Sequence, residues 1–161
     1  MKTYVITLSK HFPAKHSRAG KETFFKEAIA NGINGDAEKY EYQHYKIHTI
    51  RSNYEFWKRR VDEINAGKAV LSIRQWSGKP YQSKQVEIQR LSNIGIQKGS
   101  LSYMSFSAYA DILHEDGTGV HCEIKDLANN DGLTESEFRE WFKGYDLSNS
   151  LAIIHFTDFR Y

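Results

Sequence analysis

The sequence has little of what marks several large protein classes. Its 161 residues include a single cysteine, Cys122, and two prolines. One cysteine cannot form a disulfide within the chain or a cysteine cage for zinc. No wholly apolar run exceeds five residues, far below the roughly 20 that a membrane-spanning helix needs. Residues 1–10 lack the apolar segment of a secretory signal, so we expect a cytoplasmic protein in a reducing environment.

Enough apolar side chains remain to build a core. The composition is 40% hydrophobic and 14% aromatic, and the length suits one domain covering residues 1–161. β-Branched and alternating segments predict several strands, and shorter segments between them have helical spacing. This irregular mixture indicates an α+β fold. The predicted strands are Tyr4–Leu8, Ala69–Trp76, Lys84–Leu91 and Leu151–Phe156.

Three helices are predicted from their apolar spacing and their end signals. The first contains Phe24 and Phe25 and is expected to end at Gly32. The second is expected to begin at a Ser52–Glu55 capping box, and the third at a Thr134–Glu137 capping box. Residues 101–125 are expected to be extended around a turn.

Charge is distributed unevenly along the chain. Residues 1–100 hold 18 basic and 9 acidic side chains, a net charge of +9, whereas residues 101–161 hold 4 and 11, a net charge of −7. A basic surface of that size can bind phosphates. The two segments can equally attract each other within the fold, so charge alone leaves nucleic-acid binding open.

One short segment concentrates reactive side chains. Residues 46–51 contain an amine at Lys46, an imidazole at His48, a hydroxyl at Thr49 and a guanidinium at Arg51. These groups can donate protons to phosphate or carbonyl oxygens. In a regular strand Lys46 and Thr49 would face opposite sides, so they converge only if the chain turns near Lys46. An ordinary edge strand with solvated polar ends is the alternative.

The same segment carries a family resemblance. Lys46-x-x-Thr49-x-Arg51, after a helix and a glycine-containing loop, resembles the K-x-x-T-x-R signature of the ASCH domain family. A second stretch is also similar to the family pattern, with Asp131 just before a capped helix and then a last strand. Together these matches cover most of residues 40–161.

The resemblance implies both a fold and a function. ASCH domains are PUA-like β-barrels flanked by short helices, here with an extended N-terminal part. The family is associated with binding RNA or a modified nucleoside in a basic cleft at this motif, and some small members are N4-acetylcytidine amidohydrolases. For such an enzyme the resemblance implies that Thr49 attacks the acyl carbon, Lys46 takes the hydroxyl proton and Asp131 orients Lys46 or shuttles the proton. Asp131 stands where the family pattern has a glutamate, one methylene longer.

A second group of residues suggests nucleic-acid contacts. Aromatic and cationic side chains alternate in the turn region between the two central predicted strands, where they could stack a base and hold its phosphate. A core Trp76 with solvated cations is the alternative. With Lys46 and Arg51, the predicted nucleic-acid contacts are Arg74, Trp76, Lys79 and Tyr81. The same two alternatives apply to the tyrosines just before Lys46. Their rings could line a pocket for a base, or they could simply belong to a strand: Tyr40, Tyr42 and Tyr45.

No metal or cofactor is expected. An EF-hand register through Asn129, Asp131 and Gly132 puts Leu127 and Phe138 where calcium needs carboxylates. The histidines do not cluster at zinc spacing. The sequence thus favours a binder of RNA or a modified nucleoside. The alternatives are an amidohydrolase of acylated nucleosides and a domain that binds an acidic protein partner.

Overall fold

The computed structural model describes residues 1–35, 44–101, 107–147 and 149–161, which form an α+β fold. The strands are β1 (Lys2–Leu8), β2 (His48–Ser52), β3 (Ala69–Trp76), β4 (Gln85–Leu91), β5 (Gly95–Ser100), β6 (Tyr109–Leu113), β7 (Gly119–Glu123) and β8 (Leu151–His155). The helices are α1 (Phe25–Asn34), α2 (Tyr54–Asn65), α3 (Ile124–Asn130) and α4 (Glu135–Trp141). None of these four helices is long and apolar enough to cross a membrane.

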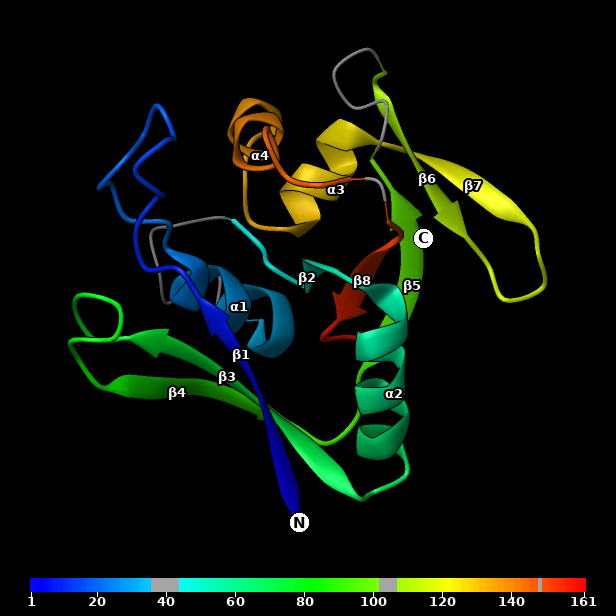
Figure 1. Cartoon of the computed structure of the whole chain (residues 1–161), viewed down its shortest axis with the longest axis horizontal. Helices are drawn as coiled ribbons and strands as arrows, with labels where there is room; N and C mark the ends of the chain where they lie inside the picture. Colours follow the sequence, from blue (N-terminus) through cyan, green and yellow to red (C-terminus); the bar gives the residue numbers. More distant parts are fainter. Residues whose placement is uncertain (36–43, 102–106, 148) are drawn as a thin grey trace.

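The strands form two separate sheets (Figure 1). The smaller has the order β1-β3-β4, with β1 parallel to β3 and β3 antiparallel to β4. The larger has the order β2-β8-β5-β6-β7 and is antiparallel throughout. Strand β8 lies between β2 and β5 and is buried at all five positions, as its continuous apolar sequence predicts.

The predicted PUA-like barrel is wrong, because both sheets are open. Within the described residues, β2 pairs only with β8 and β7 only with β6, so the larger sheet does not close on itself. Helix α2 connects β2 to β3 and packs against β3 as well as against β5 and β8. The helix therefore lies between the two sheets and keeps their strands from joining.

One cluster of buried side chains extends across both sheets and the helices. It includes Ile6 of β1 and Ile73 of β3 from the smaller sheet, Ile112 and Ile153 from the larger, and Val61 from α2. Above this core, the end of β1, the start of β2 and the α3–α4 region come together. That meeting point holds the candidate site described below.

The predicted strands and the third helix are confirmed in type and position. At α4 the Thr134 hydroxyl accepts from the Glu137 amide while the Glu137 side chain accepts from the Thr134 amide, as the capping box predicts. Residues 109–123 form the β6–β7 hairpin within the predicted extended region. Strand β5 and helix α3 were not predicted.

Two predicted helix ends are wrong. Ser52 is the last residue of β2, and Asn53 caps α2 by accepting a hydrogen bond from the Phe56 amide at 3.1 Å. Helix α1 continues past Gly32 and ends at Gly35, which has φ of +69°. Gly32 has another role: a Cβ there would lie 2.9 Å from both the Lys46 carbonyl oxygen and Ile47 Cγ2.

We expect Gly32→Ala to destabilise the protein by about 1–3 kcal/mol, because the added methyl meets backbone that cannot move without displacing Lys46. In an open helix the same change would stabilise by up to ~1 kcal/mol. Asn34→Ala, at an exposed position of α1, is the matched control and is expected to be neutral or slightly stabilising. Urea unfolding of the three proteins measures the difference. Equal or higher stability of Gly32→Ala would show that the close approach is not a constraint.

Candidate functional site

Lys46 is held by main-chain contacts on both sides. Its amide donates to the Ala28 carbonyl of α1 at 2.9 Å, and it forms an isolated antiparallel bridge with Asp131, the C-cap residue of α3. The next amide, that of Ile47, donates to the Asn130 carbonyl at 2.9 Å. The chain enters strand β2 only at His48. Lys46 therefore lies outside the regular strand. The strict alternation of side chains along β2 does not apply to it, so Lys46 and Thr49 can face the same cavity.

The side chains of Lys46 and Asp131 form a buried ion pair. Lys46 Nζ donates to Asp131 Oδ1 at 2.7 Å and to the Asp131 carbonyl oxygen at 3.0 Å. It also lies 4.3 Å from the centre of the Phe25 ring, close enough for a cation–π contact. Lys46 is only 2% exposed and Asp131 only 5%. Burying two charged groups costs hydration free energy, and here each ion is paired with the opposite charge of the other.

Burial acts on both partners of the pair. It lowers the pKa of Lys46, and the nearby Asp131 carboxylate offsets only part of that effect. Burial alone would raise the pKa of Asp131, but the Lys46 ammonium and His48 outweigh it, and the pKa of this carboxyl lies below its ordinary value. Asp131 is therefore ionised near neutral pH, and removing a proton from Lys46 is easier than from a lysine in water.

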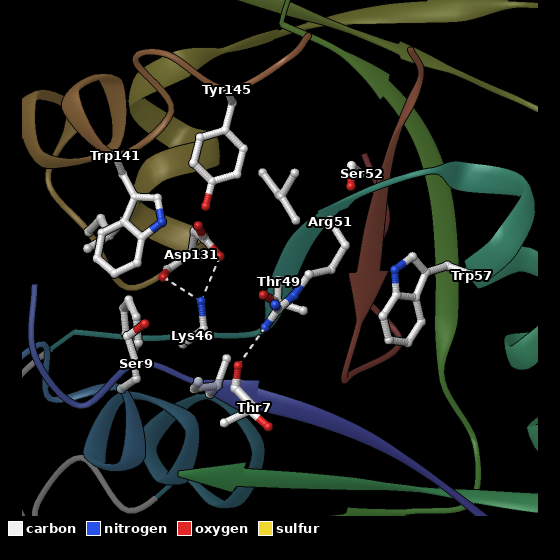
Figure 2. A pocket seen from close by; sticks show the side chains of 14 residues that line it. Thr7, Ser9, Lys46, Thr49, Arg51, Ser52, Trp57, Asp131, Trp141 and Tyr145 are labelled. Carbon is white, nitrogen blue, oxygen red and sulfur yellow. Dashed lines mark hydrogen bonds and ion pairs between the residues drawn. The ribbon is translucent and has the colours of Figure 1, made fainter. Parts of the chain in front are cut away.

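A cavity of about 240 Å³ opens above the ion pair (Figure 2). Lys46, Thr49, Arg51 and Asp131 all line it. Thr49 is 5% exposed, and its hydroxyl makes no side-chain hydrogen bond with any residue that the structure describes. The structure thus brings the three predicted catalytic residues to one cavity. Its aromatic walls come from three helices and the segment after α4: Phe25 of α1, Trp57 of α2, Trp141 of α4, and Tyr145.

Arg51 connects this cavity to the smaller sheet. One of its terminal nitrogens donates to the Thr7 carbonyl of β1 at 3.0 Å, as the dashed line in Figure 2 shows. Its buried Nε has no hydrogen-bond partner within the described ranges. A buried unpaired donor costs free energy, and the Arg51 side chain would have to shift for an acceptor in the cavity to reach this nitrogen.

A network of neutral side chains lies behind Asp131, and no sequence pattern predicted it. Asn130 Nδ2 donates to the Tyr161 hydroxyl at 2.9 Å, and that hydroxyl lies 2.6 Å from His48 Nε2. If Tyr161 accepts from Asn130 and donates to His48, the proton of a neutral His48 is assigned to Nδ1. His48 Nδ1 faces Asp131 Oδ1 at 3.6 Å, too long for a hydrogen bond but close enough for electrostatic support of the carboxylate.

The predicted contacts in the β3–β4 turn region divide into two groups. Trp76 and Tyr81 line a second cavity that shares Arg51 with the first. Arg74 instead donates through Nε to Ser72 at 2.9 Å, and neither Arg74 nor Lys79 lines either cavity.

Of the three tyrosines before Lys46, only Tyr45 lies among the described residues. Tyr40 and Tyr42 lie outside the described residues, and Tyr45 is half exposed without lining the cavity. Across the part of the chain that the structure describes, no group of three or more His, Cys, Asp or Glu side chains could hold a metal ion.

The buried histidines predict how stability depends on pH. Burial lowers the pKa of His48, and burial together with the nearby His48 and Arg160 lowers the pKa of His155 to about 3. An unfolded histidine has a pKa of about 6.5, so between that value and about 3 the unfolded chain binds a proton that folded His155 does not. Stability then falls with falling pH, by about 2 kcal/mol for this one histidine at pH 5.

His155→Gln should remove this contribution. We expect the variant to lose about 2 kcal/mol less than the wild type between pH 7.5 and 5.0, measured by urea unfolding at each pH. His11→Gln, at an exposed position in the loop after β1, is the control and should keep the wild-type dependence. An unchanged pH dependence in His155→Gln would mean that His155 has the same pKa in the folded and the unfolded chain.

Comparisons of the chain with protein-family models, with curated proteins and with solved structures found no match. The site is therefore interpreted from its own residues, and the ASCH resemblance rests on the two sequence stretches that carry it.

Proposed function

We propose that this chain binds an acylated nucleoside in the cavity at Lys46 and hydrolyses the amide that joins the acyl group to the base. One observation carries the proposal. Lys46, Thr49 and Asp131, which the ASCH-like motif positions assign to catalysis, line one cavity although Asp131 is 82 residues beyond Thr49 in the sequence. A buried lysine–aspartate pair beneath an unbonded hydroxyl is costly to maintain and is more typical of a reactive site than of a structural core.

The proposed reaction proceeds in two steps. Thr49 Oγ1 attacks the acyl carbon while its proton passes to Lys46, and the carbon–nitrogen bond breaks as Lys46 returns that proton to the departing amine. Water then attacks the resulting Thr49 ester, the ester bond breaks, and the carboxylic acid leaves as the threonine hydroxyl is restored. The overall change consumes one water and yields the free amine and the acid.

The hydrogen bonds of Lys46 are compatible with this role. An ammonium has three N–H donors, and two of them are used by Asp131 Oδ1 and the Asp131 carbonyl oxygen. The remaining position serves the Thr49 hydroxyl or the substrate carbonyl. Because burial lowers the pKa of Lys46, its neutral, proton-accepting form is more accessible than that of a lysine in water. Asp131 then acts as the group that orients Lys46.

The walls of the cavity support a small planar ligand. Its volume of about 240 Å³ is below the roughly 300–1,000 Å³ typical of pockets for drug-sized molecules. Trp141 and Tyr145 lie near Asp131, and Trp57 lies beyond Arg51 (Figure 2). Aromatic side chains at these positions can stack on a base, and the Arg51 Nε, after a shift of its side chain, can donate to its carbonyl or ring acceptor.

Binding without turnover is the second candidate, and the ion pair itself favours it. As the ammonium of the ion pair, Lys46 carries its full set of protons and cannot accept another. The same cavity would then hold a modified nucleoside by its aromatic walls and Arg51, with Thr49 as a hydrogen-bonding group only. The two candidates differ in whether the Thr49 hydroxyl changes turnover or only affinity.

Thr49→Val tests the hydrolase directly, because valine has nearly the same shape but no hydroxyl. We expect kcat for N4-acetylcytidine, followed by chromatography of released cytidine, to fall by roughly 10³-fold or more. Thr49→Ser keeps a hydroxyl and should retain measurable turnover. A wild-type protein that binds N4-acetylcytidine but releases no cytidine would favour the binder. Turnover by Thr49→Val at the wild-type rate would show that Thr49 is not the nucleophile.

A further inference from the structure

A larger groove adjoins the candidate cavity and has no role in the reaction described above. It has a volume of about 680 Å³ and is formed by the end of β1, the loop of residues 9–13 and the β3–β4 turn. Four residues line both the cavity and the groove: Thr7, Leu8, Ser9 and Arg51. The cavity and the groove therefore adjoin at these four residues.

The junction and the groove wall are cationic. Arg51 uses one terminal nitrogen on the Thr7 carbonyl, and its Nε has no partner in the described part of the chain. Lys10 and His11 line the groove farther along, and no carboxylate is among its described lining residues. A guanidinium that lines two adjoining hollows is placed to bind the phosphodiester that joins two nucleotides.

The far wall of the groove presents aromatic rings. Trp76 and Tyr81 lie with ring centres 5.1 Å apart, and Tyr81 is 90% exposed. Tyr81 also has φ of +62°, a conformation that costs free energy in any residue other than glycine and that concentrates at functional positions. The turn is fixed by Ser83 Oγ, which accepts from the Gly78 amide and donates to the Lys79 carbonyl. An exposed ring held in a strained turn offers a flat face to a base.

We infer that this groove binds the nucleotide next to the acylated one, with its base stacked on Trp76 and Tyr81 and the connecting phosphodiester at Arg51. The substrate class is then an acylated nucleotide within a single-stranded oligonucleotide, not the free nucleoside. This inference rests on the proposed use of the cavity as a nucleoside site. Stacking and phosphate contacts do not read a base sequence, so the groove accepts different neighbouring bases.

The test compares binding of a fluorescein-labelled six-nucleotide single-stranded RNA, with one central N4-acetylcytidine, by fluorescence anisotropy. We expect Tyr81→Ala to weaken binding by roughly 5- to 100-fold, the range for loss of one stacked base. Tyr81→Phe keeps the ring and should bind within about twofold of the wild type. Tyr109→Ala removes another exposed tyrosine, on β6 and away from both hollows, and should not change binding.

Binding and turnover are measured separately so that the two proposals can fail independently. Tyr81-dependent binding of the RNA without conversion of its N4-acetylcytidine to cytidine and acetate would retain the groove and remove the hydrolase. Two results would overturn the groove: equal affinity of wild type and Tyr81→Ala for the labelled RNA, or RNA binding no tighter than that of free N4-acetylcytidine. If either result came with release of cytidine from free N4-acetylcytidine, the groove would be rejected and the hydrolase retained.

Discussion

Three segments of the chain meet where the charge of Lys46 is buried against that of Asp131. Each ion loses several kcal/mol of hydration on burial, so the pair is tolerated only while both partners stay in contact. The main chain enforces that contact through the Lys46–Asp131 bridge and the hydrogen bond from Lys46 to Ala28. Gly32 leaves room for the Lys46 carbonyl, and Gly132, with φ of +78°, turns the chain away directly after Asp131. The ion pair thus fixes how α1, α3 and the start of β2 pack together.

The network behind Asp131 suggests why this pair is present at all. A buried ion pair is weak support for stability, since apolar side chains of equal volume often stabilise as well or better. Here the carboxylate faces Lys46 on the cavity side and the neutral His48, bonded to Tyr161, on the core side. A purely structural pair needs no open cavity over it and no unbonded hydroxyl beside it. The arrangement is better explained by a function that uses the polarity of this site.

Local signals predicted much of the fold and part of the site. The Thr134–Glu137 box, strand β8 and the reactive 46–51 segment could be identified because each depends on neighbouring residues. The open sheets could not, since they result from the parallel pairing of β1 with β3 and from α2 lying between the sheets, which are long-range contacts. Side chains two residues apart in a strand point to the same side, so the apolar Ile50 would have placed His48 towards the core as well. No pattern near Tyr161 indicates that its hydroxyl reaches His48.

The shorter acid at position 131 need not weaken the site. The ASCH-like pattern has a glutamate there, and an aspartate on an unchanged backbone would fall about one methylene short of Lys46. In this protein the backbone compensates for the shorter side chain, because the antiparallel bridge places residues 46 and 131 directly opposite each other. The carboxylate then reaches Lys46 Nζ at 2.7 Å, and the Asp131 carbonyl oxygen adds a second contact at 3.0 Å. A longer side chain on this backbone would have to fold back or push Lys46 into the cavity, so aspartate is the acid that fits the bridge.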